Sequence, residues 1–485
     1  MKIKIHRGTH QIGGSVTEYE YNGWHLFVDY GEELPGGPKS GDLRVEGLTH
    51  GDLSKSALLI THYHGDHIGS IPKLPKELPI FMGSVGREIQ RILSNRLKSV
   101  SITHKEMLSR LEDVRTFEAG RNFSFGPFTI MPIIMDHSAF DAYAFRIEGG
   151  GVTAFHTGDF RTHGFRSKKL PKVIKKYVGE VNYVVCEGTN VSRPTASCLS
   201  EHELQKQFKG AFAEHKGNVV YVSSTNVDRL FALYHAAVAV GRKFLVDNYQ
   251  MNIMEEVVKR DTMWGKSNLY KFKEGNMPMV LQFEDGEFRA NDRFKWLLDQ
   301  TGYVLIARAN PLFDDFIGRI PGEKKKYLSM WKGYVDPKNE AYNESMAVSV
   351  GKNYLYMHTS GHCDMNSLNE LFQMLHPRAI IPIHTDNPEA FAKLFCKEWP
   401  VIVLNDGDSI SPFSDSYVDS EYAMVVSGKK KKCIGYFKSD EDARIALAHT
   451  VFGTTNKTRY EIIEEEDMTN CKREEGFLSS LKITE

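Results

Sequence analysis

Apolar segments that end in polar, metal-binding residue types recur through the first 190 residues of the chain. The segment SVTEYEY alternates polar and apolar side chains, which is typical of a half-buried strand, and IKIHRG and GWHLFVDYG flank it. Farther along, four segments each have the pattern of a buried strand followed by His, Asp or Glu, namely SALLITHYHGDH, FTIMPIIMDH, GVTAFHTGDF and VNYVVCEGT. Four strands that end in such residues predict one site at the edge of a sheet.

The pattern changes at about residue 190. SEHELQKQFKGAFAEHKG predicts a helix, NVVYVSSTNVDRLFALYHAAVAVGRKFLVD a strand, loop, helix and strand, and TGYVLIARAN another strand. This order predicts a parallel sheet flanked by helices. Near residue 354 the earlier pattern returns with YLYMHTSGHCD, a helix in NSLNELFQML and a strand in AIIPIHTD. We therefore predict a domain at 191–353, inserted into a domain made of residues 1–190 and 354–414.

The last segment, 415–485, has the pattern of a small α+β extension. KKKKCIGYFKS, DEDARIALAHTVF and RYEIIEEED predict a strand, a helix and a strand. The lysines 429–432 could bind RNA, but 415–485 holds 11 Lys and Arg against 14 Asp and Glu. We favour a solvated hairpin end for this run.

Composition narrows the class of protein. A chain of 485 residues is long enough for two or three domains. Its 61 Lys and Arg against 62 Asp and Glu leave a net charge of -1, so a nucleic acid would have to be held in a local groove. The six cysteines form no CxxC pair, which argues against a zinc ribbon or a disulfide framework. Because the chain shows neither a signal peptide nor an apolar run long enough to span a membrane, we expect a cytoplasmic protein.

The strongest chemical signal is HYHGDH at residues 62–67, where four metal-binding side chains lie within six positions. Alternate spacing places His62 and His64 on one side of an extended backbone, while Asp66 and His67 turn toward a neighbouring point. Imidazole with some carboxylate suits zinc, and such a cluster can serve two metals held close together. A single loop histidine needs no metal, but this set after an apolar strand favours a metal site.

HxHxDH resembles the signature of the metallo-β-lactamase superfamily. The resemblance implies an α/β fold, a four-layer αββα sandwich with the metals at one edge. Three further motifs match in order: Asp29 in FVDYG would support the ligand loop, His137 in MDHS would bind the first metal, and Asp159 in HTGDF would bridge both metals.

The inserted domain resembles the β-CASP insertion of nucleic-acid-processing members. Its three motifs match Glu187 in VVCEGT, His362 in HTSGHCD and His384 in IIPIHTD. Each of these residues alone would more often be structural. A histidine at the third motif is typical of the RNA-processing branch, where it binds the second metal. The resemblance covers about residues 1–414 and includes the RNase J type, whose C-terminal extension is usually longer than the one here.

The resemblance implies two zinc ions, which manganese could replace. His62, His64, His137 and Asp159 would hold the first, and Asp66, His67, His384 and Asp159 the second. Hydroxide formed between the metals would attack the phosphorus. His362 would donate a proton to the leaving ribose oxygen and Glu187 would orient its ring, so Asp66, His362 and Glu187 are the expected catalytic residues.

Substrate contacts are expected from the inserted domain. Ser223, Ser224, Thr225 and Asn226 precede a helix whose N-terminus could bind a phosphate, and Arg229 could add charge. The alternative is plain N-capping without a ligand. Gly361, beside His362, could let a phosphate approach the backbone closely.

The resemblance implies a β-CASP ribonuclease, and we expect it to act on single-stranded RNA. One alternative is a small-molecule metallohydrolase such as a lactonase, which would need neither the insertion nor a His362–Glu187 pair. Another is a nonenzymatic RNA-binding paralogue, against which the complete ligand set argues. Endonuclease or 5′-exonuclease action, and self-association into a homo-oligomer, stay open.

Overall fold

We describe the protein from a computed structural model of the 485-residue chain. Residues 1–37, 41–193, 198–260 and 267–410 are described in full, together with the backbone of three strands between 422 and 464. Of the described helices, none is long and apolar enough to cross a membrane. The cysteines of the fully described ranges, Cys186, Cys198, Cys363 and Cys396, are unpaired.

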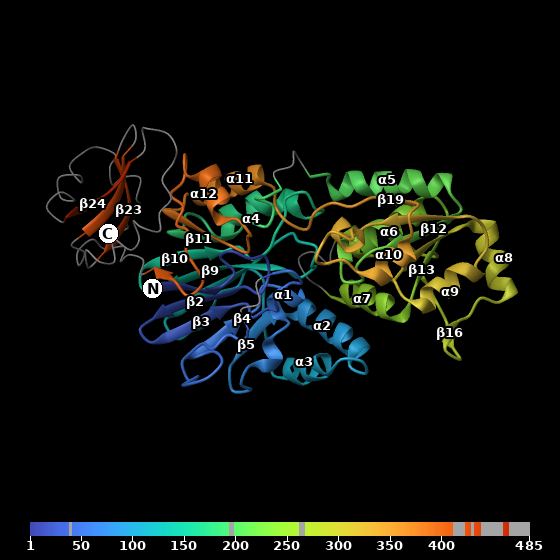
Figure 1. Cartoon of the computed structure of the whole chain (residues 1–485), viewed down its shortest axis with the longest axis horizontal. Coiled ribbons are helices and arrows are strands. Elements are labelled where there is room, and N and C mark those ends of the chain that lie inside the picture. The colour runs from blue at the N-terminus through green and yellow to red at the C-terminus, as the bar shows by residue number, and fades with distance from the viewer. Residues whose placement is uncertain are drawn as a thin grey trace.

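Two mixed sheets form the centre of the first domain (Figure 1). The first has seven strands, in spatial order β21 (Ser409–Ile410), β1 (Lys2–Arg7), β2 (Val16–Tyr21), β3 (Trp24–Val28), β4 (Ser56–Leu59), β5 (Ile80–Gly83) and β6 (Arg115–Phe117). The second has six, in the order β20 (Ala379–Ile383), β11 (Tyr183–Glu187), β10 (Val152–His156), β9 (Tyr143–Gly149), β8 (Phe128–Ile134) and β7 (Phe123–Phe125). Strands β3 to β6 of the first sheet, and β10, β11 and β20 of the second, run parallel. The ends of parallel strands meet at one edge of each sheet, where the expected site residues follow them.

The two sheets pack face to face, and helices cover their outer faces. Leu26 and Leu59 from the first sheet share one buried cluster with Phe128 and Phe145 from the second. Met107 of α3 (Ile102–Glu112) packs on the outer face of the first sheet. The outer face of the second is covered by α4 (Leu170–Tyr177), α11 (Met365–Leu375) and α12 (Pro388–Phe395). This layering confirms the predicted αββα sandwich.

The inserted domain has its own parallel sheet. Its strands are, in order, β14 (Met279–Val280), β13 (Lys243–Val246), β17 (Tyr303–Ala307), β12 (Gly217–Tyr221), β18 (Lys324–Leu328) and β19 (Tyr354–Tyr356). One face packs against α5 (Glu201–Glu214), α6 (Val227–Ala239) and α7 (Asn248–Lys259). The other packs against α8 (Asp292–Thr301), α9 (Pro311–Arg319) and α10 (Glu344–Val350).

The predicted parallel sheet flanked by helices is therefore present, and one boundary differs from the expectation. Strand β19 pairs with β18, so the inserted sheet extends past the predicted boundary at 353. The sequence pattern of 354–356 is that of an ordinary apolar strand, and only its pairing assigns it to a sheet.

The remaining elements complete the described part of the chain. They are α1 (Gly65–Ile68), α2 (Ser84–Leu97), the hairpin strands β15 (Phe283–Glu284) and β16 (Glu287–Phe288), and the 3-10 turns η1 (Ile71–Lys73), η2 (Ser167–Lys169), η3 (Asn268–Tyr270) and η4 (Lys332–Val335).

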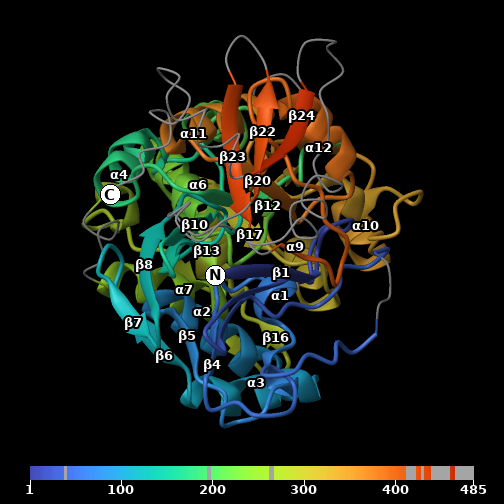
Figure 2. The same cartoon turned by 90° about the vertical axis from the view of Figure 1, so that its left-hand side faces the viewer.

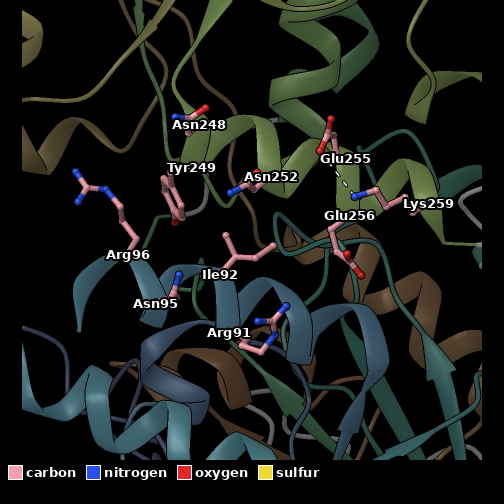
Figure 3. Close-up of a pocket in the computed structure, with 10 residues that line it drawn as sticks. All are labelled: Arg91, Ile92, Asn95, Arg96, Asn248, Tyr249, Asn252, Glu255, Glu256 and Lys259. Atoms are coloured by element: carbon pink, nitrogen blue, oxygen red, sulfur yellow. Dashed lines mark ion pairs between the residues drawn. The ribbon is translucent and has the colours of Figure 1, made fainter. Parts of the chain in front are cut away.

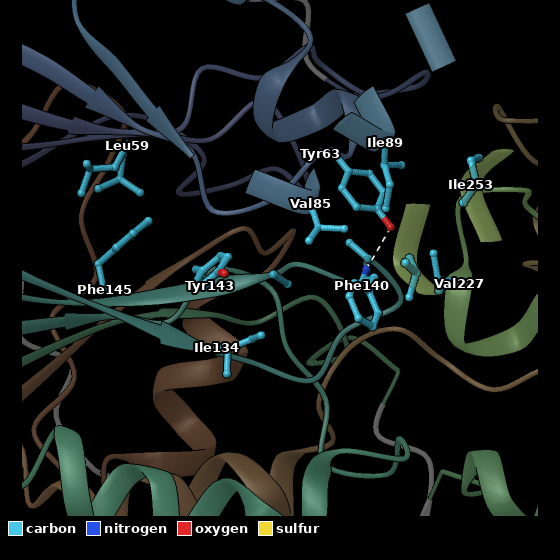
Figure 4. Packing of buried hydrophobic residues seen from close by; sticks show 14 of the residues in the cluster. Leu59, Tyr63, Val85, Ile89, Ile134, Phe140, Tyr143, Phe145, Val227 and Ile253 are labelled. Atoms are coloured by element: carbon cyan, nitrogen blue, oxygen red, sulfur yellow. Dashed lines mark hydrogen bonds between the residues drawn. The ribbon is translucent and has the colours of Figure 1, made fainter. Parts of the chain in front are cut away.

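The buried core continues from the sandwich into the inserted domain. Tyr63, which follows the candidate ligand His62, lies in this cluster with Val227 of α6 and Ile253 of α7 (Figure 4). Its hydroxyl accepts a hydrogen bond from Phe140 N at 2.9 Å and donates one to Thr225 O at 2.8 Å. The ligand loop is thus bonded directly to the segment that precedes α6.

Three antiparallel strands lie at the end of the molecule away from the inserted domain (Figures 1 and 2). They are β22 (Tyr422–Ser427), β23 (Lys431–Phe437) and β24 (Arg459–Glu464). The strands expected in KKKKCIGYFKS and RYEIIEEED are present. The expected helix in DEDARIALAHTVF and the side chains of lysines 429–432 lie outside the described residues.

Candidate active site

The carboxylate of Asp29 holds the loop that follows β4 and carries the candidate ligands. Asp29, at the end of β3, accepts hydrogen bonds from Thr61 N and Thr61 Oγ1, each at 2.7 Å. It also accepts one from His67 Nδ1 at 2.7 Å, which leaves Nε2 of that ring to face the site. These contacts are the ones that the expected supporting role of Asp29 requires.

Three imidazoles converge to form the first ligand group. His64 Nδ1 lies 3.1 Å from His62 Nε2 and 3.2 Å from His137 Nε2. Ligand atoms around a tetrahedral zinc ion are about 3.3 Å apart, so these nitrogens already have the right spacing. Burial lowers the pKa of all three rings, that of His64 to about 4, so they are neutral and can offer lone pairs.

The second ligand group consists of Asp66, His67, Asp159 and His384, whose ligand atoms lie within 4.8 Å of one another. His384 Nε2 is 3.2 Å from Asp66 Oδ2, and His67 Nε2 is 3.1 Å from Asp159 Oδ2. Asp159 Oδ1 is buried and, within the described residues, has no hydrogen-bond partner. Asp159 Oδ2 also lies 3.9 Å from His62 Nε2, so this carboxylate stands between the two groups. A buried carboxylate oxygen without a donor, facing histidine nitrogens, fits a metal ligand.

Contacts with neighbouring groups fix the orientation of two further ligand rings. His137 Nδ1 donates to Gly361 O at 2.6 Å, and His384 Nδ1 forms a hydrogen bond with Thr189 Oγ1 at 2.8 Å. Such contacts select the tautomer that presents the other nitrogen to a metal. A Cβ atom on Gly361 would lie 2.9 Å from Ser138 Oγ, so the glycine lies in close contact with the residue that follows His137.

The pair formed by His362 and Glu187 stands beside both ligand groups. His362 Nδ1 lies 3.1 Å from Glu187 Oε2 and 3.8 Å from Asp159 Oδ2. Burial lowers the pKa of His362, but the two carboxylates outweigh burial and raise it to about 9. The ring centroid is 5.3 Å from that of His137 and 5.7 Å from that of His384. A cationic imidazole in this place can donate a proton to a group bound between the ligand sets.

A buried network of ion pairs underlies the site, and our sequence reasoning missed it. The Arg161 guanidinium donates to Asp136 Oδ1 at 3.0 Å, Glu201 Oε1 at 2.7 Å and Asp228 Oδ2 at 2.8 Å. All four side chains are essentially inaccessible to solvent. Because Glu201 begins α5 and Asp228 lies in α6, the network joins the sandwich to the inserted domain.

Two residues of the network also lie next to candidate metal ligands in the sequence. Asp136 directly precedes the candidate ligand His137, and Arg161 is the second residue after Asp159. The only local signal for this role is that Asp136 lies inside the motif MDHS and Arg161 directly follows the motif HTGDF. A charged residue beside a motif looks the same in sequence whether it is buried or exposed. For this reason the ion-pair network was not identified from the sequence.

Arg229 does not have the role expected of it. Its side chain is fully buried, and its guanidinium donates to Glu201 Oε2 at 2.9 Å and Glu201 Oε1 at 2.8 Å. It also donates to the hydroxyl of Ser329. A phosphate could reach Arg229 only by breaking these buried bonds, so Arg229 holds α6 and α5 together.

The residues before α6 divide into capping and partly accessible groups. Asn226 caps the helix, since its side chain accepts from Arg229 N at 3.2 Å, and Ser224 Oγ accepts from Gln250 Nε2 at 3.2 Å. Both are buried. Ser223 and Thr225 are half-buried, and their hydroxyls are 2.9 Å apart. The capping alternative therefore describes Asn226, while Ser223 and Thr225 are partly exposed residues whose hydroxyls bond to each other.

A separate hollow lies where the two domains meet. A cavity of about 350 Å³ lies between α2 and α7. Arg91, Arg96, Glu255, Glu256 and Lys259 are among its lining side chains (Figure 3). None of the residues that line it belongs to the ligand groups or to the His362–Glu187 pair. The cavity is therefore distinct from the candidate metal centre.

Comparisons with known proteins match two parts of the chain to described families. Residues 49–205 match the Beta-lactamase superfamily domain, and residues 353–404 match the Zn-dependent metallo-hydrolase RNA specificity domain. These two segments contain all seven candidate metal ligands, His362 and Glu187.

Curated relatives cover most of the chain. Ribonuclease J of Mycoplasma genitalium is 23% identical over 405 residues, which cover 79% of this chain and 67% of the relative. Ribonuclease J of Mycobacterium tuberculosis is 25% identical over 420 residues, which cover 79% of this chain and 68% of the relative. This chain thus spans about two thirds of their length.

A solved structure supports the same fold. A protein of unknown function from Enterococcus faecalis matches with a TM-score of 0.64 at 18% identity, over 84% of this chain and 99% of that one. The layered sandwich, the inserted parallel domain and the family matches together support a metallo-β-lactamase protein of the β-CASP, ribonuclease J-like type.

Proposed function

We propose that this protein is a zinc-dependent ribonuclease that hydrolyses phosphodiester bonds of single-stranded RNA. The observation that carries the proposal is the position of Asp159, between a three-histidine group and a second group of three ligands, with His362 beside both. The RNA substrate is inferred from the matched RNA specificity domain and from the ribonuclease J relatives.

The ligand assignment follows the two groups. His62, His64 and His137 would hold one metal, and Asp66, His67 and His384 the other, with Asp159 shared between them. When bound, two such ions supply Lewis-acid activation of a water molecule and of a phosphoryl oxygen. The predominance of histidine favours zinc, with manganese as a substitute.

His362 is the proposed proton donor for the leaving ribose oxygen. Its Nδ1 is engaged with Glu187, so Nε2 remains to transfer the proton. Glu187 is itself fixed, because its Oε1 accepts from Phe160 N at 3.2 Å. Glu187 therefore acts as a positioning residue that keeps the ring oriented and cationic.

The proposed RNA contacts are fewer than the sequence suggested. Ser223 and Thr225, which are partly exposed and lie just before α6, would contact a phosphate, and the bond from Tyr63 to Thr225 O holds this segment beside the ligand loop. Gly361, Ser224, Asn226 and Arg229 contribute by supporting the site rather than by touching RNA.

The test is a comparison of substrates with the full chain. We expect cleavage of labelled single-stranded RNA, much slower cleavage of DNA of the same sequence, and negligible turnover of simple lactones. A chelator should abolish RNA cleavage, and added zinc or manganese should restore it. Equal rates on RNA and DNA would overturn the RNA assignment, and faster turnover of a lactone would overturn the whole proposal.

A matched pair of variants checks that the cleavage comes from this site. His64→Ala removes a ligand of the first group and should abolish RNA cleavage. His50→Ala alters a partly exposed histidine that forms an ion pair with Glu46, and this variant should cleave RNA at the parental rate. If His64→Ala still cleaves RNA at the parental rate, the activity comes from a contaminating nuclease.

A further inference from the structure

A third cluster of metal-binding residue types lies outside the catalytic groups. His163, Cys198 and Asp364 each offer one ligand atom, and these atoms lie within 4.8 Å of one another. The three residues come from different segments: the loop that follows Asp159, the segment that enters α5, and the start of α11. The proposed chemistry uses none of them.

The His163 ring is held in the form that a metal ligand needs. The residue is only 9% exposed, and its Nε2 donates to Ser360 O at 2.7 Å. Because a carbonyl can only accept, Nε2 carries the proton and Nδ1 carries a lone pair. Nδ1 is buried and, within the described residues, has no hydrogen-bond partner. A buried acceptor of this kind is costly to leave unpaired, which points to a missing partner.

The other two residues supply complementary ligands. Asp364 caps α11 with Oδ1, which accepts from Ser367 N at 2.9 Å, and its second oxygen is left for another partner. Cys198 is half-buried and unpaired, and burial raises the pKa of its thiol. Binding of a cation deprotonates a coordinating thiol, so this barrier would be removed by the metal itself.

Imidazole, thiolate and carboxylate together suit a borderline divalent ion such as zinc. Tetrahedral zinc keeps its ligand atoms about 3.3–3.6 Å apart, so no two of the three atoms need to approach by more than about 1.5 Å. The backbone around them is already tied together, since Glu201 N donates to His163 O at 2.9 Å and Thr359 Oγ1 donates to Leu199 O at 2.6 Å. These bonds hold the three segments together, so we expect the adjustment to come from the side chains.

We propose that His163, Cys198 and Asp364 form a third metal site that binds one zinc ion, with a water molecule in the fourth position. The site is separate from the two catalytic ligand groups. It joins the segment entering the inserted domain and the segment after it to the loop that carries Asp159, so its role is to hold the domains together at the active site.

Cobalt reconstitution tests this site independently of catalysis. Neither catalytic ligand group contains a cysteine, so a thiolate-to-cobalt charge-transfer band in the near ultraviolet would report the third site alone. The full chain, stripped with a chelator and reloaded with Co²⁺, should bind three ions and show this band. Binding of at most two ions, without the band, would overturn the proposal.

Variants assign the band to its residues. Cys198→Ser should lose the band and one of the three ions while keeping the other two, whereas Cys396→Ser, at the end of α12, should keep all three and the band. Survival of the band in Cys198→Ser would overturn the assignment.

A milder variant covers the case in which Cys198→Ser does not fold. Asp364→Asn retains a side chain that can cap α11 but is a poorer ligand. It should release one ion at least tenfold more readily to a competing chelator, with the other two unaffected. Unchanged retention of all three ions in Asp364→Asn would contradict the proposal.

Discussion

The carboxylate of Asp29 accepts a hydrogen bond from His67 Nδ1 at 2.7 Å, and this contact decides which nitrogen of the ring faces the second ligand group. A carboxylate can only accept, so His67 must carry its proton on Nδ1 and present Nε2 as a ligand. The same carboxylate holds Thr61 through two more hydrogen bonds.

Asp29→Asn should weaken the second metal. The amide offers a donor where His67 needs an acceptor, so the ring loses its preferred tautomer. We expect metal affinity at that position to fall about 10–100-fold, the usual effect of losing such a partner. Competition with a chelator measures it, and Asp52→Asn in an exposed turn serves as the control. Equal metal retention in both variants would contradict the role of Asp29.

His384 and His362 should separate into a ligand and a proton donor. His384→Ala should lose retention of one metal, because His384 Nε2 faces Asp66. His362→Ala should keep both metals and cleave RNA about 10²–10⁴-fold more slowly, the usual range for general acid catalysis. The defect should shrink with a nitrophenyl phosphodiester, whose leaving group hardly needs a proton.

Two results with His362→Ala would contradict the role of His362 as a proton donor. Asp159, Glu187, His362 and His384 also have ligand atoms within 4.8 Å, so His362 could itself be a ligand. Loss of a metal in His362→Ala would assign it that role instead. Cleavage of RNA at the parental rate would remove it from the mechanism.

Glu187→Gln should reproduce the His362→Ala defect in a milder form. Glutamine can still accept a hydrogen bond from His362, but it lacks the charge that stabilises the cation. We expect slower RNA cleavage, with a smaller loss on the nitrophenyl substrate, and unchanged metal content. Because Glu187 also accepts from Phe160 N, thermal unfolding should be measured alongside. An equal loss on both substrates would indicate a structural defect rather than a proton-transfer one.

The Arg161 network should contribute strongly to stability. Arg161→Met leaves the buried carboxylates of Asp136, Glu201 and Asp228 without a shared partner. Breaking a buried ion pair in this way costs about 3–5 kcal/mol. Arg121→Met, which removes an exposed pair with Glu118, should cost less than about 1 kcal/mol. Denaturant unfolding of both variants measures the difference, and similar losses would contradict the network's importance.

Stability should fall in acid through Glu201. Burial raises the pKa of this carboxyl, but Arg229 and Arg161 outweigh burial and hold the pKa well below the ordinary value of 4.5. A carboxyl whose folded pKa is depressed stabilises the fold above its unfolded pKa, and that contribution is lost as the pH falls below about 4.5. Asp136 and Asp228 share the network, and the pKa of Asp228 is raised by burial, so its contribution has the opposite sign.

The test is the free energy of unfolding as a function of pH. Parental protein should lose stability between about pH 5 and pH 3, and Glu201→Gln should show a lower plateau with a shallower slope in that window. Parallel pH profiles for the two proteins would show that Glu201 does not carry the acid sensitivity.

Local pattern alone determined much of this protein. Alternation and apolar runs identified the strands, and the spacing in HYHGDH placed four ligand types together, because strand period and short-range spacing depend only on neighbouring residues. The order of strand, helix and strand likewise predicted the inserted parallel sheet.

Only the tertiary structure decided which distant groups meet. His384 Nε2 contacts Asp66 across 318 positions, and strand β19 joins the inserted sheet rather than the sandwich. Arg161 follows the candidate ligand Asp159, and Arg229 follows the segment 223–226. The residues next to each arginine do not show whether it is a buried partner of Glu201 or a contact for a phosphate. Burial of a charge depends on the elements that pack over it, and that packing is set by contacts far apart in the chain.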